Sequence, residues 1–121
     1  MAKHGEFNHI EFPADDVERA KAFYSAVFGW QFRGMDEMPD YFLYEAGPGG
    51  LGGGLGKRGV NAPDAIRNYI AVDSIDDSLA AARDNGGSIV VPKTDIGIGW
   101  YAAITDTEDN ELGLYKSKSP G

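Results

Sequence analysis

The fold is decided by residues 8–24, which read NHIEFPADDVERAKAFY. The stretch opens with alternating polarity, which is typical of a half-buried strand because successive side chains point to opposite faces. His9 and Glu11 share one face. Ile10 and Phe12 share the other, which is expected to pack on a helix. The first element is therefore predicted to be a strand over residues 7–12.

A helix follows this strand. Asp15 and Glu18, three residues apart, are typical of a capping box that begins a helix. Gly29 suits the left-handed backbone conformation that ends one. The apolar residues between them recur at helical spacing, so we expect them to form one buried stripe: Val17, Ala20, Phe23, Tyr24 and Val27.

The second half of the chain repeats this pattern. Asp15 and Asp73 are 58 residues apart, and so are Gly29 and Gly87. Ser74 with Asp77 is a weaker capping box, and Gly86 is the second helix stop. The apolar stripe of this helix is predicted to be Ile75, Leu79 and Ala82.

One strand precedes each helix and three short strands follow it. The predicted strands are 7–12, 30–33, 41–46 and 51–57, then 67–72, 88–91, 100–105 and 111–116. This order predicts a single α+β domain over 1–121 with helices on one face of the sheet. It consists of two tandem βαβββ modules, about 6–58 and 66–117, joined by a linker at 56–66. The glycine-rich residues 47–52 are interpreted as a turn into a strand, because a dinucleotide-binding loop must open a helix.

Composition excludes several functions. The net charge is −8, and an acidic surface repels phosphate backbones, so no nucleic-acid partner is expected. The absence of cysteine excludes disulfides, zinc–thiolate sites and a cysteine nucleophile. No secretory signal is visible in residues 1–7, and no apolar run could cross a bilayer, so we expect a cytoplasmic protein without membrane contacts. His4 is expected in a frayed terminus, which leaves His9 as the histidine available for chemistry.

A family resemblance rests on the motifs at 8–24, 28–30, 69–72, 85–87, 91–94, 99–100 and 109–115, so it runs over nearly the whole chain. In these motifs the chain resembles the vicinal-oxygen-chelate superfamily of glyoxalases, bleomycin-resistance proteins and dioxygenases, in the branch related to lactoylglutathione lyase. The resemblance implies a curled mixed sheet around a cleft, frequent dimerisation, and four metal ligands, one pair from each half. The metal would act as a Lewis acid on vicinal oxygens of the substrate.

The first and third ligand positions of the family are only partly filled. His9 matches the first position. The third position falls on Arg67 if the two halves are aligned without gaps. It falls on Tyr69 if the loop before the second helix is two residues shorter. Arginine offers no lone pair to a metal, and tyrosine would be an unusual ligand.

The second and fourth positions carry no donor. The second falls on Gly53 or Gly54, and strand alternation favours Gly54. The fourth falls on Gly113. With His9 as the only matching family ligand, we predict no metal ligands and no cofactor, because catalytic metals need about three protein ligands. A divalent metal is the alternative, with further ligands from a partner subunit or from misaligned residues such as Glu45 or Glu111.

The glycines suggest a pocket, because a missing side chain leaves room for a ligand. Tyr101 is an alternative to Trp100 in its lining, and the aromatic residues would otherwise fill the cleft or pack a dimer interface. His9 and Glu11 are the candidate catalytic residues, as an acid/base pair, unless Glu11 only orients His9. The predicted ligand-binding residues are His9, Glu11, Gly54, Tyr69, Trp100, Gly113 and Tyr115.

Three functions follow from these residues. The leading hypothesis is a small-molecule-binding protein without a catalytic metal, with catalysis left open. The second is a metal-dependent lyase, isomerase or dioxygenase of the same superfamily. The third is a non-catalytic interaction module, and a homodimer is the expected assembly.

Overall fold

The computed structural model describes residues 2–46 and 51–119, so residues 47–50 of the turn predicted at 47–52 lie outside the described residues. The chain forms two compact units. One unit takes His9–Arg67. The other takes the described residues of Asn68–Gly121 and Met1–Asn8. Both units mix helix and strand, as the α+β prediction requires.

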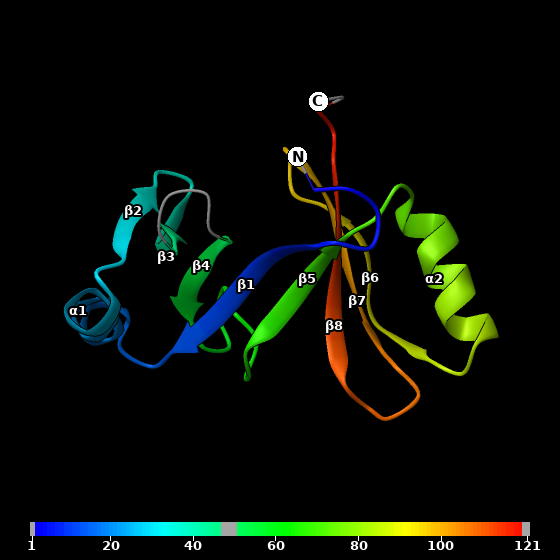
Figure 1. Ribbon diagram of the computed structural model, residues 1–121, viewed down its shortest axis with the longest axis horizontal. Helices are drawn as coiled ribbons and strands as arrows, with labels where there is room; N and C mark the ends of the chain where they lie inside the picture. Colours follow the sequence, from blue (N-terminus) through cyan, green and yellow to red (C-terminus); the bar gives the residue numbers. More distant parts are fainter. Residues whose placement is uncertain (1, 47–50, 120–121) are drawn as a thin grey trace. The chain divides into compact units, whose positions relative to one another are not determined.

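The two units repeat one topology, which confirms the predicted βαβββ plan. In each, the first strand pairs in parallel with the last, and the other neighbours are antiparallel. Each helix lies beside the strands of its own unit (Figure 1). The first-half order is β2-β3-β4-β1, from β1 Phe7–Ala14, α1 Val17–Phe28, β2 Gln31–Met35, β3 Met38–Glu45 and β4 Gly52–Lys57. The second-half order is β5-β8-β7-β6, from β5 Arg67–Ala71, α2 Ile75–Asp84, β6 Ser88–Asp95, β7 Gly99–Thr105 and β8 Glu111–Ser117.

The start of α1 differs by one residue from the prediction. Asp16 is the N-cap, and its carboxylate accepts from the backbone N–H of Arg19 at 3.0 Å. Asp16 holds the extended backbone that an N-cap requires. Asp15, predicted as the cap, instead accepts a hydrogen bond from Arg58 Nε at 2.9 Å. The stop at Gly29 is confirmed, with φ at 73°.

The buried stripe of α1 is narrower than predicted. Val17 is buried, and Ala20 and Tyr24 pack against the same core, which includes Leu55. Phe23 and Val27 are 58% and 54% exposed, so their assignment to the stripe was wrong. Phe23 does not share the helix face of Val17 and Tyr24, because it precedes Tyr24 by one residue and consecutive residues are rotated by about 100° around the helix axis.

The second helix agrees with its prediction. Ser74 is the N-cap and its hydroxyl accepts from Asp77 N at 3.1 Å. Ile75 and Leu79 are buried in a core that includes Leu114. The helix ends before Gly86, whose φ is 96°.

Strand β6 is longer than predicted. The sequence predicted a strand over 88–91, and the observed strand continues through Pro92 to Asp95. Proline is tolerated because β6 is the outermost strand in the order of its unit, where an N–H is not required on the open side. The register between β6 and β7 shifts between Val91 and Thr94, next to this proline.

Candidate functional site

Strand β1 presents His9 and Glu11 on the face opposite α1. Phe12 packs against the α1 core, so its neighbours in the strand point the other way. Glu11 lies opposite Gly54 of β4. The next residue of β4, Leu55, is 1% exposed in the α1 core, which places Gly54 rather than Gly53 on the Glu11 face.

The space over Gly54 is occupied by Tyr41 of β3. A β-carbon built on Gly54 would lie 1.9 Å from the hydroxyl oxygen of Tyr41 and 2.4 Å from its Cζ. Tyr41 is itself buried, with 6% of its surface exposed. The missing side chain of Gly54 therefore makes room for a phenol of the same chain.

A hydrogen-bonded chain joins three side chains on this face. The hydroxyl of Tyr41 donates to Oε2 of Glu11 at 2.7 Å, and the same oxygen lies 3.1 Å from Nε2 of His9. A hydroxyl has one proton, and here it goes to Glu11. Nε2 of His9 is therefore the donor to Tyr41, and Nδ1 carries the lone pair of the ring.

Burial keeps this histidine neutral. It lowers the pKa of His9 from 6.5 to about 4, because the charged imidazolium loses its hydration. Glu11 is only 8% exposed. A neutral imidazole held in one tautomer can accept a hydrogen bond or a proton from a ligand, while Tyr41 and Glu11 fix its orientation.

The second unit contains a related arrangement without a histidine. Tyr69 of β5 lies opposite Gly113 of β8, and a β-carbon on Gly113 would lie 2.3 Å from Cδ2 of Tyr69. The ring of Tyr101 meets Tyr69 edge to face, with centroids 6.3 Å apart. Tyr115 covers Gly99 in the same manner, with 2.7 Å from its hydroxyl to the β-carbon position. Tyrosine rings therefore occupy the space at glycines in both units.

Strand register relates the two halves to each other. The leucines after Gly54 and Gly113 both pack against helices, so these glycines are equivalent. Their partners, Glu11 and Tyr69, are then equivalent as well. Arg67, two residues before Tyr69, takes the place that the histidine takes in the first half. Arg67 is buried, with 8% of its surface exposed.

Trp100 does not share the face of Gly113. It packs on the helix side of β7 against the α2 core, and Ala103, rather than Trp100, lies opposite Gly113. The ammonium groups of Lys93 and Lys118 lie 5.2 and 5.1 Å from its ring centroid. Alternation in β7 could have shown this, because Trp100 has the parity of the buried Ala102.

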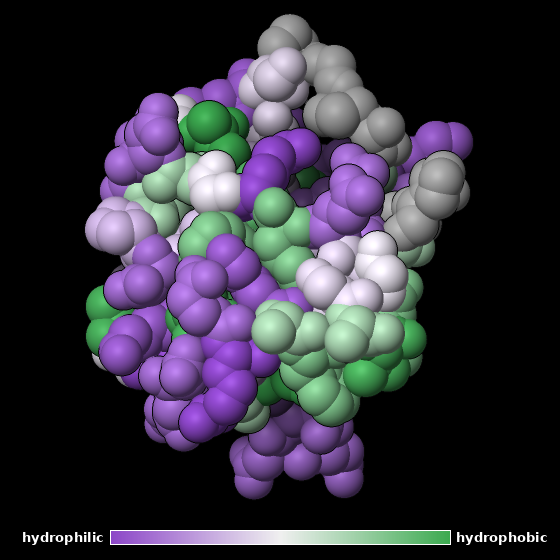
Figure 2. Space-filling view, turned by 90° about the vertical axis from the view of Figure 1, so that its left-hand side faces the viewer, coloured by the Kyte–Doolittle hydropathy of each residue, from purple (hydrophilic) through white to green (hydrophobic). Residues whose placement is uncertain are grey.

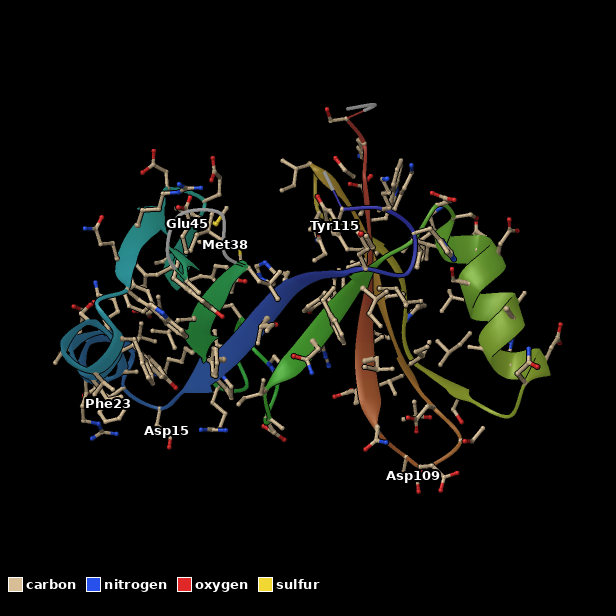
Figure 3. All side chains as sticks on the ribbon, in the orientation of Figure 1. Asp15, Phe23, Met38, Glu45, Asp109 and Tyr115 are labelled. Atoms are coloured by element: carbon tan, nitrogen blue, oxygen red, sulfur yellow. The ribbon has the colours of Figure 1, made fainter. Side chains whose placement is uncertain are left out.

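The other polar candidates are exposed side chains. Glu45 is exposed at the end of β3, next to β2 (Figure 3). Glu111 is exposed at the start of β8, opposite Thr105. His4, expected in a frayed terminus, instead accepts a hydrogen bond from the backbone of Asp73 at 3.0 Å.

The donors present do not fit the divalent metal that the resemblance implies. Gly54 and Gly113 offer no ligand atom, and tyrosine rings occupy the space above them. Nε2 of His9 and a carboxylate oxygen of Glu11 both bond the hydroxyl of Tyr41. Within residues 2–46 and 51–119, no three His, Asp or Glu side chains converge as a metal site requires.

Comparison with known proteins identifies relatives of the whole chain. Residues 6–47 match the family described as "Bleomycin resistance protein-like N-terminal". A glyoxylase-like domain-containing protein of Didymella fabae is 32% identical over 119 residues, covering 91% of this chain and 92% of that protein. CFP32 of Mycobacterium bovis, provisionally described as a glyoxylase, is 29% identical over 132 residues, with 95% of this chain covered.

The length of these relatives differs. This chain spans about half of CFP32, with 47% of that protein covered. A solved Mn(II)-bound glyoxalase from Novosphingobium aromaticivorans matches with a TM-score of 0.62 at 16% identity, over 96% of this chain and 40% of that one. At this identity the structural match shows a shared fold.

No helix among the described residues is long and apolar enough to span a membrane.

Proposed function

Because the chain belongs to the glyoxalase-like, vicinal-oxygen-chelate superfamily, we propose that it binds a small molecule on its His9 face without a catalytic metal. The observation that carries this proposal is the position of Tyr41. Its ring occupies the space at Gly54, and its hydroxyl holds both His9 and Glu11. The two potential metal ligands of the first half, His9 and Glu11, therefore both hydrogen-bond to the hydroxyl of Tyr41.

The same residues suggest how a ligand is held. The neutral imidazole of His9 is the group proposed to exchange a hydrogen bond or a proton with a hydroxyl, amide or acidic C–H of the ligand. Tyr41 and Glu11 have a positioning role in this proposal, because they orient the imidazole ring of His9. If a reaction occurs, His9 is the group that accepts the proton, and Glu11 stabilises the imidazolium through Tyr41.

Metal analysis tests the first part of the proposal. Protein is purified from medium supplemented with nickel, zinc, iron and manganese, and its metal content is measured by mass spectrometry. We expect well under one ion per chain. One tightly bound ion per chain that is lost in His9→Ala would overturn the proposal.

A ligand screen tests the second part. Small carbonyl and carboxylate metabolites are screened for an increase in melting temperature, because a ligand that binds only the folded state stabilises it. We expect a compound whose effect is lost in His9→Ala and reduced in Tyr41→Phe. Tyr24→Phe, which changes a tyrosine on the opposite face, is the matched control. Hits that stabilise His9→Ala equally would place binding elsewhere.

A homodimer is the third part of the functional proposal. The outer side of α1 carries three apolar side chains that are each more than half exposed: Phe23, Val27 and Phe28. Figure 2 shows an apolar area on this side of the molecule. Apolar area of this kind is commonly buried against another protein surface.

A further inference from the structure

A hollow of about 430 Å³ lies over the paired strands β2 and β3 of the first unit. Its lining includes Gln31 and Arg33 from β2 and Leu43 and Glu45 from β3. Phe32 between the β2 residues packs in the α1 core. These side chains therefore point to the face opposite α1 by strand alternation.

The register joins this hollow to the His9 face. Leu43 lies opposite Gly54, which lies opposite Glu11 on its other side. Glu45 lies opposite Gly52, so in this row β4 itself places no side chain between Glu45 and β1. A ligand in the hollow can therefore extend across Gly52 toward Tyr41 and the imidazole that it holds.

Two side chains of opposite charge line the hollow and do not form an ion pair with each other. Arg33 and Glu45 are diagonal neighbours, because Arg33 pairs with Leu43 and Glu45 pairs with Gln31. Within residues 2–46 and 51–119 neither side chain forms a hydrogen bond or an ion pair. Other exposed charges of this chain do pair, as in Arg58–Asp15 at 2.9 Å. The hollow thus offers one cationic and one anionic group to a ligand.

We propose that this hollow binds a small zwitterion, a molecule with a carboxylate for Arg33 and an amine for Glu45 on a short apolar body. A guanidinium binds a carboxylate through paired hydrogen bonds. A net charge of −8 disfavours a ligand of net negative charge, whereas a zwitterion carries none. Leu43 provides apolar contact between the two charges. The inference rests on the proposed function, because it names the ligand class for the same face.

The test uses L-leucine as the probe, with two analogues that each lack one charge. These are 4-methylpentanoate, which lacks the amine, and 3-methylbutylamine, which lacks the carboxylate. Binding is followed by changes in the backbone amide NMR signals of residues 31–33 and 43–45. We expect saturable binding of L-leucine with a Kd of about 1 mM and at least tenfold weaker binding of both analogues.

Two variants and a control assign the charges. Arg33→Gln and Glu45→Gln should each weaken L-leucine binding at least tenfold. Glu37→Gln, an exposed glutamate at the β2–β3 turn, should bind as the wild type does. Equal binding of an analogue, wild-type affinity in both hollow variants, or no saturation by about 20 mM would overturn the inference.

The outcome also separates this inference from the proposed function. If L-leucine fails while a screened compound requires His9, the zwitterion assignment is wrong and the proposed function stands. If metal analysis gives one ion per chain held by His9, the proposed function is wrong whatever L-leucine does.

Discussion

The hydroxyl oxygen of Tyr41 lies 1.9 Å from the place that a β-carbon on Gly54 would take. The two residues are on adjacent strands, and the phenol reaches across the glycine to Glu11 and His9. A packed tyrosine ring therefore lies at Gly54, where the family resemblance implies a metal ligand. The metal-free proposal depends on this contact.

Gly54→Ala should destabilise the protein. The new methyl group would overlap the Tyr41 ring, which is buried and hydrogen-bonded, so the ring must move and lose those bonds. We expect a loss of about 1–3 kcal/mol in the free energy of unfolding, measured in urea. Gly34→Ala is the matched control, because its β-carbon meets nothing closer than 3.4 Å. Equal stability of the two variants would show that Tyr41 is not held over Gly54.

Tyr41→Phe should remove two hydrogen bonds and keep the ring. We expect a loss of about 1–2 kcal/mol in the free energy of unfolding. It should also allow the other tautomer of His9, because no hydroxyl accepts from Nε2. Nitrogen NMR of the imidazole reports the tautomer directly. Tyr24→Phe should change neither quantity, and a wild-type tautomer in Tyr41→Phe would refute the role given to the phenol.

Acid should destabilise the protein through His9. Its pKa is about 4 in the folded state against 6.5 without burial, so between these values the unfolded chain binds more protons. Stability from the neutral imidazole is present above pH 6.5 and is lost as the pH falls toward 4. Urea unfolding from pH 7 to 4.5 should show this loss, at most about 3 kcal/mol.

His9→Gln should flatten that pH profile. Glutamine does not titrate, so the part of the slope due to His9 disappears. His4→Gln keeps His9 and should follow the wild-type profile. A His9→Gln profile as steep as that of the wild type would assign the acid sensitivity to other groups.

Phe23→Ser should weaken the proposed dimer. Phe23 is exposed on the outer side of α1, so its replacement removes apolar surface without disturbing the core. Sedimentation at low micromolar concentration should show a dimer for the wild type and more monomer for the variant. Val60→Ser, at another exposed apolar residue, is the control. A monomeric wild type would contradict the proposal.

The elements of the fold could be predicted because they depend on local patterns. Alternation in β1 separates His9 and Glu11 from Phe12, and Ser74 and Gly29 mark helix ends through their own backbone chemistry. Errors occurred where tertiary packing decides. The exposure of Phe23 depends on how much of α1 meets its sheet, and Pro92 is tolerated because β6 is the outermost strand in the order of its unit.

By itself, the sequence determined the two βαβββ halves, the face that carries His9, and the glycines at two positions where the family resemblance implies metal ligands. Only the tertiary structure decided what occupies the space at those glycines. Tyr41 is 13 residues from Gly54 in sequence, and no local pattern predicts that its ring crosses the neighbouring strand. Pairing of β5 with β8 places Tyr69 opposite Gly113, so Arg67, two residues before Tyr69, is the counterpart of His9 in strand register. Strand register is a property of long-range hydrogen bonding, which a linear pattern leaves open.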